Sequence, residues 1–164
     1  MKHLYLIRHA KSDWSDGSQS DFERGLNKRG QKAIFTMAEV LSEKNIMPDL
    51  ILSSSAKRAR LTAEGLAKNI HYSGKIKYID ALYMAEPSEI IDKIKAIKDK
   101  YNVIFIVGHN PETTELTELL INETIDNVPT LGIVALNVAV EHWKNIKAEN
   151  IKLDFFIYPK MSSK

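Results

Sequence analysis

The sequence predicts an α/β fold, a three-layer α/β/α sandwich with a mostly parallel sheet of about six strands. Short apolar runs alternate along the chain with segments whose apolar residues recur at helical spacing. The run Val103 to Val107 is apolar throughout, which is typical of a central parallel strand covered on both faces. The chain has 164 residues, 44% of them hydrophobic and 27% charged, which is ordinary for one globular domain. We therefore expect a single domain over residues 1–164.

The expected strands are short and are bounded by turn residues or polar segments. The first begins at Leu4 and delivers Arg8 and His9 at its carboxyl end. The others follow at 49–53, 76–79, 103–107, 132–140 and 151–158. We expect the last two to form a hairpin or an edge pair.

The expected helices begin at residues that favour helix N-termini. These residues are Asn27, the serines Ser53 to Ser55, Pro87 with Ser88, and Asn110 with Pro111. The helix after the serines is expected to run from about residue 56 to 70. The segment 12–24 is polar and long for an α/β connection, and long ordered loops are often functional.

Four side chains are expected to meet at one edge of the sheet. Arg8 and His9 follow the first strand, Arg58 falls in the first turn of the helix after the second strand, and His109 follows the fourth strand. Right-handed crossovers place the carboxyl ends of these strands at the same edge, where open α/β sheets bind their ligands. A cation at the start of a helix is unfavourable unless an anion lies nearby, so Arg58 also indicates a functional site.

Two guanidinium groups, two imidazoles and two helix N-termini describe a pocket for a dianion such as a phosphoryl group. Arginine forks match phosphate oxygens, and free N–H groups at helix starts add positive field. Neighbouring cations disfavour protonated imidazole, so a histidine there keeps a lone pair for attack. Once phosphate is bound, the second imidazole can instead be cationic and stabilise the phosphoryl oxygens.

Other chemistries lack their residues. The chain has no cysteine, no Walker or G-x-G-x-x-G loop, no G-x-S-x-G elbow and no metal-ligand spacing, so we expect neither a cofactor nor a metal. His3, His71 and His142 are expected to be structural or solvated. A net charge of +2 and a basic run without aromatic platforms argue against nucleic acid. Short apolar runs and an N-terminus that enters a strand at once predict no membrane span, no signal peptide and a cytoplasmic location.

The residues resemble the histidine phosphatase superfamily, also called the phosphoglycerate mutase-like fold. The resemblance rests on Leu6 to Ala10 for its R-H-G signature, Ser53 to Glu64 for its second-arginine helix, and Val107 to Pro111 for its second histidine. Asp21 to Leu26, with the following Lys28-Arg29-Gly30, and the short chain are similar to small phosphohistidine phosphatases of the SixA type.

The resemblance implies a role for each of the four residues. His9 is the nucleophile that becomes phosphorylated, Arg8 and Arg58 hold the phosphoryl oxygens, and His109 completes the pocket. Ser15 is a further candidate phosphate ligand, although mutase-like members carry an asparagine at that place. Two other departures are Ala10 in place of glycine, and Arg24-Gly25-Leu26 without the family proline.

The proton donor to the leaving group is left open by the sequence. Larger family members use a carboxylate after the third strand, which makes Glu86 the first candidate, with Asp13 and Asp21 behind it. Glu86 can equally be a helix-start carboxylate that the helix dipole favours. Imidazole is a better leaving group than an alkoxide, so a missing acid favours phosphohistidine over phosphate esters.

We expect a metal-independent phosphatase that forms a phosphohistidine intermediate on His9 and acts on phosphohistidine in a partner protein. Short connections after the third and fourth strands leave no room for a cap domain that would enclose small sugar phosphates. The alternatives are a phosphatase of small phosphomonoesters and a non-catalytic module that binds phosphorylated partners.

Overall fold

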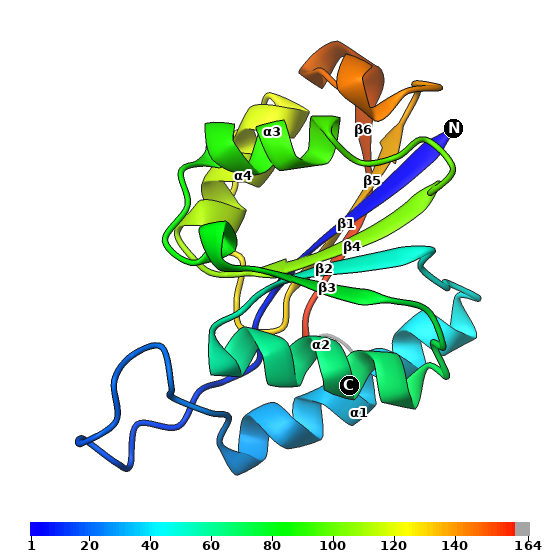
Figure 1. The fold of residues 1–164 in the computed structure, drawn as a ribbon. Coiled ribbons are helices and arrows are strands. Elements are labelled where there is room, and N and C mark those ends of the chain that lie inside the picture. Colours follow the sequence, from blue (N-terminus) through cyan, green and yellow to red (C-terminus); the bar gives the residue numbers. More distant parts are fainter. Residues whose placement is uncertain (160–164) are drawn as a thin grey trace.

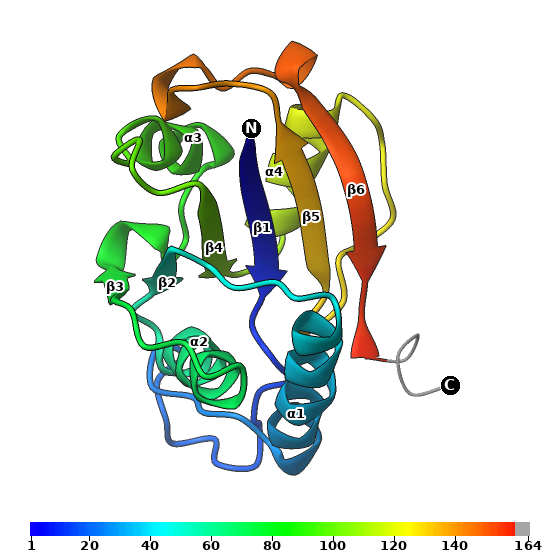
Figure 2. The ribbon, with the colours of Figure 1, turned by 90° about the vertical axis from the view of Figure 1, so that its right-hand side faces the viewer.

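The computed structural model describes residues 1–159, and in this part a six-stranded sheet lies between two layers of helices (Figure 1). The strands are β1 (Lys2–Arg8), β2 (Leu50–Ser54), β3 (Ile76–Ile79), β4 (Val103–Gly108), β5 (Ile133–Val138) and β6 (Ile151–Ile157). Figure 2 shows their order across the sheet, β3-β2-β4-β1-β5-β6. β5 is antiparallel to both β1 and β6, and the other neighbours pair in parallel. The predicted mostly parallel sheet, with its antiparallel last pair, is confirmed.

The helices pack on both faces of the sheet and form a separate hydrophobic core on each face. They are α1 (Lys28–Glu43), α2 (Lys57–Asn69), α3 (Pro87–Lys95) and α4 (Glu112–Ile121). In Figure 1, α1 and α2 cover one face of the sheet and α3 and α4 cover the other. Met37 and Leu66 pack on the first face with Phe105, and Ile94 and Leu116 belong to the core of the second. This is the three-layer sandwich that the alternating pattern predicts.

The helix starts agree with the sequence at Asn27 and differ at two other places. Asn27 caps α1, since its Oδ1 accepts the Gly30 N–H at 2.8 Å. The serines before α2 provide no N-cap, because Ala56 holds that position. Their hydroxyls are engaged elsewhere: Ser53 donates to the Ser54 carbonyl, Ser54 is paired with His109, and Ser55 donates to Asp80. At α4 the N-cap is Pro111, one residue after the expected Asn110.

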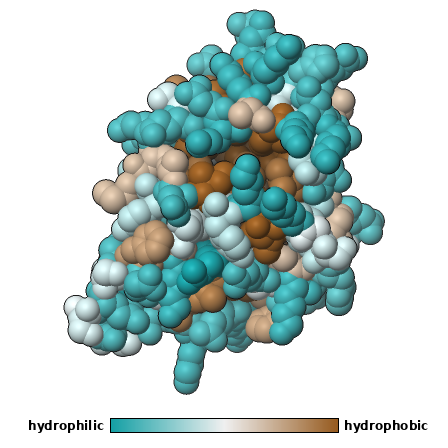
Figure 3. Space-filling view, viewed as in Figure 1, coloured by the Kyte–Doolittle hydropathy of each residue, from teal (hydrophilic) through white to brown (hydrophobic). Residues whose placement is uncertain are grey.

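The core reaches the surface at one edge of the sheet. Figure 3 shows apolar side chains in the middle of the face seen in Figure 1, between the helical layers, where β3 lies. β3 is four residues long, and a short edge strand offers little backbone for pairing with another chain. Within residues 1–159, no helix is long and apolar enough to cross a membrane.

The segment that leaves β1 is held tightly against the start of α1. The Lys11 carbonyl accepts the Asn27 N–H at 3.0 Å, and Ser12 forms an isolated antiparallel bridge with Leu26. A Cβ placed on Gly30 would lie 2.3 Å from the Lys11 carbonyl oxygen. Glycine is therefore required at this position by the close approach of two backbones. The loop between these contacts projects at the carboxyl edge of the sheet, at the lower left of Figure 1.

The Gly30→Ala variant is expected to unfold more easily than the wild type. Alanine normally favours a helix over glycine by about 0.5–1 kcal/mol. Here the added methyl must displace the Lys11 backbone, and such overpacking costs about 1–3 kcal/mol. Urea unfolding measures the difference, with Gly17→Ala as the control because a Cβ there meets no atom within 4 Å. A Gly30→Ala protein as stable as the control would contradict this packing.

Candidate active site

Four side chains from three segments meet at the carboxyl edge of the sheet. Arg8 ends β1, His9 follows it, Arg58 lies in the first turn of α2, and His109 follows β4. The ring centroids of His9 and His109 are 5.3 Å apart. Besides burial, the positive charges of Arg8 and Arg58 lower the pKa of both imidazoles, and the charge of Arg58 lowers the pKa of Arg8. His9, Arg58 and His109 are buried, with 7%, 7% and 5% of their surface exposed. The structure thus brings together the four residues that the sequence singles out.

The backbone fixes the tautomer of His9. Its Nδ1 lies 2.7 Å from the Ala10 carbonyl oxygen, which can only accept a hydrogen bond, so Nδ1 carries the proton. Nε2 is then left with a lone pair. Burial lowers the pKa of His9 to about 3; the Ala10 hydrogen bond opposes this shift, while His109, Arg58 and Arg8 add to it. At neutral pH the ring is an uncharged imidazole, the form that a nucleophile requires.

His109 and Arg8 each present a buried nitrogen that has no partner. His109 Nε2 lies 2.8 Å from Ser54 Oγ, while its Nδ1 has no hydrogen-bond partner among the described residues. Burial lowers the pKa of His109 to about 4, with Arg58 and Arg8 lowering it further and Asp21 opposing them. Arg8 donates from Nη1 to the Val128 carbonyl at 3.0 Å, and its Nε is also unpartnered within the described chain. Unpartnered buried polar groups are costly, so these atoms suit the oxygens of a bound oxyanion.

Arg58 is held in place by Asp21 from the loop after β1. Its Nη1 donates to the Asp21 carbonyl at 2.7 Å and its Nη2 to the Asp21 carboxylate at 3.1 Å. The same carboxylate accepts from Arg24 and from the Tyr83 hydroxyl. The Tyr83 hydrogen bond and Arg58 hold the pKa of Asp21 at about 2, against the effect of burial. Asp21 is therefore the anion that the position of Arg58 requires, and it is ionised at neutral pH.

Thr62 joins this arrangement to the segment that carries His9. The Ala10 N–H donates to Thr62 Oγ1 at 2.9 Å, and that hydroxyl donates to the Arg58 carbonyl at 2.7 Å. Ala10 and Thr62 are fully buried. The sequence gives no direct sign of Thr62, although it lies one helical turn after Arg58 on the same face of α2.

Arg58 and His109 line a cleft of about 460 Å³. Tyr83 and four carboxylates line it too: Asp21, Glu86, Glu112 and Glu115. The structure places the predicted Glu86 here, exposed at the start of α3. Glu112 was not foreseen, although its place three residues after His109 is a sequence signal that could have indicated it.

Ser15 lies apart from this cleft. It is exposed on the loop after β1, where its N–H donates to the Asp13 carboxylate at 2.8 Å, and it is not among the residues that line the cleft. Its role as a phosphate ligand stays a prediction. Within residues 1–159, no three or more histidine or carboxylate side chains form a group that could hold a metal ion.

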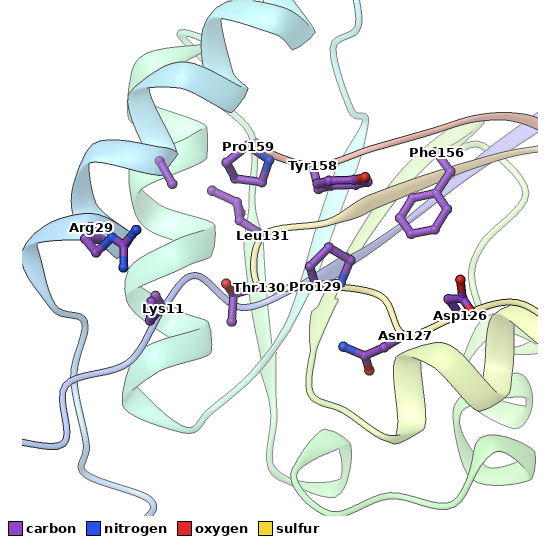
Figure 4. Close-up of a pocket in the computed structure, with 11 residues that line it drawn as sticks. Lys11, Arg29, Asp126, Asn127, Pro129, Thr130, Leu131, Phe156, Tyr158 and Pro159 are labelled. Carbon is purple, nitrogen blue, oxygen red and sulfur yellow. The ribbon is translucent and has the colours of Figure 1, made fainter. Parts of the chain in front are cut away.

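A larger hollow of about 700 Å³ lies elsewhere on the molecule (Figure 4). Lys11 and Arg29 line one side of it, and Phe156 and Tyr158 lie on the side formed by the end of β6. None of the four convergent side chains lines this hollow. Arg58 and His109 line the smaller cleft, and the ring of His9 lies beside that of His109, so the smaller cleft is the candidate active site.

Several known proteins are similar to this chain in sequence and in fold. The sequence profile of the histidine phosphatase superfamily (branch 1) matches residues 4–82. The uncharacterized protein ML1117 of Mycobacterium leprae is 30% identical over 168 residues, which cover 94% of this chain and 100% of that protein. The chain belongs to the histidine phosphatase superfamily.

Solved structures of histidine phosphatases extend this result. A crystal structure assigned as the phosphohistidine phosphatase SixA of Agrobacterium tumefaciens is 30% identical, with a TM-score of 0.84 over 96% of this chain and 98% of that one. An Escherichia coli structure assigned as an α-ribazole-5′-P phosphatase has a TM-score of 0.73 over 97% of this chain and 98% of that one, at 16% identity. The predicted SixA-type resemblance and phosphoglycerate mutase-like fold are confirmed. The second structure shows that the fold is shared with a protein assigned to a small substrate.

The rings of His9 and His109 are expected to stay neutral where an ordinary histidine, with a pKa of 6.5, becomes protonated. Both pKa values are lowered, to about 3 and about 4. Acid therefore protonates these groups in the unfolded chain first, and the stability present above about pH 6.5 is lost as the pH falls toward those values. Long-range 1H–15N NMR spectra between pH 8 and 5 measure the protonation state of each ring, with His9→Gln and His109→Gln for assignment. A doubly protonated His9 ring at pH 6 would contradict the lowered pKa of this group.

Asp21→Asn is expected to lower stability at neutral pH and to lose its effect in acid. The pKa of Asp21 is depressed from 3.8 to about 2, so its contribution is present above about pH 4 and disappears as the pH falls toward 2. The carboxylate side chain is 48% exposed, and solvent screening limits the loss to about 1 kcal/mol. Chemical unfolding at pH 6 and at pH 2.5 measures it, beside the exposed neighbour variant Glu23→Gln. Equal stabilities of the two variants at pH 6 would show that the Asp21 contacts contribute nothing.

Proposed function

We propose that this histidine phosphatase hydrolyses phosphohistidine in a partner protein, through a phosphorylated His9. The observation that carries the proposal is the state of His9, a buried neutral imidazole whose Nδ1 proton is bound to the Ala10 carbonyl. Arg8, Arg58 and His109 all act electrostatically on this ring, and they supply the charge that a phosphoryl dianion requires. Because two guanidinium groups provide that charge, we propose a reaction without a metal ion or other cofactor.

The proposed reaction has two displacements at phosphorus. In the first, His9 Nε2 forms a bond to phosphorus while the bond to the substrate nitrogen breaks. Arg8 and Arg58 hold the equatorial oxygens, and His109 Nδ1, protonated in the presence of the dianion, donates to one of them. In the second, water attacks phosphorus, and the electrons of the P–Nε2 bond return to His9. The His9 ring leaves as neutral imidazole because Nδ1 keeps its proton.

The openness of the site supports a protein substrate. The connection from β3 to α3 covers residues 80–86, and the one from β4 to α4 covers residues 109–111. Neither is long enough to hold a cap domain, so a side chain presented on another protein can reach the cleft. Similarity to the structure assigned as SixA of Agrobacterium tumefaciens supports the same substrate class.

A phosphatase of small phosphomonoesters is the second candidate. The cleft contains carboxylates, among them Glu86, and an alkoxide leaving group depends on a proton donor more strongly than imidazole does. A non-catalytic phosphate-binding module is the third candidate. Neither nucleic acid nor a membrane is part of the proposal.

The His9→Ala variant is expected to form no phosphoenzyme and to lose hydrolysis down to the uncatalysed rate. The measurement uses a phosphohistidine-bearing protein, with the acid-labile phosphoenzyme detected after rapid quenching. Arg58→Ala is expected to lower kcat/KM by about 10²–10³, the cost of losing one charge-stabilising donor. Arg60→Ala, on the same helix but outside the cleft lining, is the matched control and is expected to stay near the wild type.

A panel of small phosphomonoesters separates the candidates. A higher kcat/KM for any ester than for the phosphohistidine protein would favour the second candidate. A His9→Ala protein that binds phosphate tightly and keeps its cellular function would favour the binding module. Wild-type protein that forms no phosphoenzyme from either substrate class would refute the proposed function.

A further inference from the structure

Glu112 is the carboxyl group in the cleft whose surroundings suit a proton carrier. It is the first residue of α4, three residues after His109, and its side chain is partly buried. Arg58 from α2, Glu86 from the start of α3 and Glu115 one turn further along α4 are the charged groups that act on it. Glu112 lines the same cleft as Arg58 and His109, so its carboxyl group borders the space that a substrate bound between them would occupy.

We propose that Glu112 is the catalytic acid and base of the reaction, which gives its proton to the departing imidazole and recovers one from the attacking water. The inference rests on the proposed function above. It differs from the expectation that Glu86 is the donor, and it adds a residue that neither the sequence motifs nor the four convergent side chains include.

The other carboxyl groups near the site are less suited to hold a proton. Asp21 accepts three side-chain hydrogen bonds, which hold its pKa at about 2. Hydrogen bonds from Ser15 lower the pKa of Asp13. Glu86 and Glu115 are exposed to solvent. For Glu112, burial raises the pKa above its usual value; a hydrogen bond from its own backbone N–H and the charge of Arg58 oppose this shift, while Glu115 and Glu86 add to it. Raised carboxyl pKa values are the usual property of a general acid.

The leaving group of phosphohistidine is an imidazole ring, and this determines where the proton of Glu112 goes. Nε2 of His9 forms a bond to phosphorus, and the electrons of the breaking P–N bond go to the substrate nitrogen. A proton from the Glu112 carboxyl passes to the other nitrogen of the substrate ring, so the ring leaves as neutral imidazole and not as imidazolate. Water then attacks phosphorus and releases a proton to the Glu112 carboxylate. The products are inorganic phosphate and a free histidine, and both Glu112 and His9 return to their starting states.

The two rings that exchange the phosphoryl group have the same requirement. Each must carry a proton on the nitrogen remote from phosphorus in order to leave as neutral imidazole. For His9 the Ala10 carbonyl holds that proton in place, at 2.7 Å from Nδ1. Glu112 supplies the corresponding proton for the substrate ring, which arrives on a partner.

The test compares two small probes that differ in their need for this proton. N-phosphoimidazole requires protonation at its second nitrogen, whereas its N-methylated cation is already charged there and requires none. In Glu112→Gln, kcat/KM for N-phosphoimidazole at pH 8 is expected to fall by about 10²–10⁴, the usual contribution of a general acid. The value for the methylated cation is expected to stay within about threefold, because a uniform loss would indicate a structural role.

Glu123→Gln is the control, since Glu123 is an exposed carboxylate just after the end of α4 and is not among the residues that line the cleft. It is expected to change neither probe by more than about threefold. If Glu112→Gln and Glu123→Gln behave alike while the wild type phosphorylates His9, the inference fails and the proposed function stands. If the wild type forms no phosphoenzyme from N-phosphoimidazole or from a phosphohistidine protein, both fail together.

Discussion

The site depends on holding two guanidinium groups close to each other at one edge of the sheet. Their mutual repulsion is offset by different partners, the Val128 carbonyl for Arg8 and the Asp21 carboxylate and carbonyl for Arg58. The resulting positive field acts on both imidazoles, adding to burial, and keeps His9 and His109 neutral. The arrangement that suits a dianion therefore also keeps His9, the proposed nucleophile, uncharged.

Much of the site could be predicted because topology alone positions residues at strand ends. Arg8, His9 and His109 lie at the carboxyl ends of parallel strands, and such strands end at one edge of the sheet whatever the loops do. Arg58 was found through a local conflict, a cation at a helix start, which implies an anion without naming it. That anion is Asp21, 37 residues earlier in the chain, and loop conformation rather than periodicity brings it there.

The parts that could not be predicted depend on burial and on neighbours from several segments. Three serines before α2 suit an N-cap, yet tertiary contacts with His109 and Asp80 engage two of their hydroxyls. Glu86 was selected for its place after the third strand, but its exposure could not be read from that position. The surroundings of Glu112 come from α2, α3 and α4 together, and no sequence window contains them.

One turn of α2 connects the chemistry to the stability of the fold. Thr62 Oγ1 accepts the Ala10 N–H and donates to the Arg58 carbonyl, so the residue whose carbonyl fixes the His9 tautomer is bound to the turn that carries Arg58. The next residue, Lys11, lies with its backbone close against Gly30 at the start of α1. A shift of either helix therefore moves the Ala10 carbonyl, and with it the proton on Nδ1. The tautomer of His9, the proposed nucleophile, therefore depends on backbone packing between two helices, and the chemistry of its ring cannot be separated from the fold.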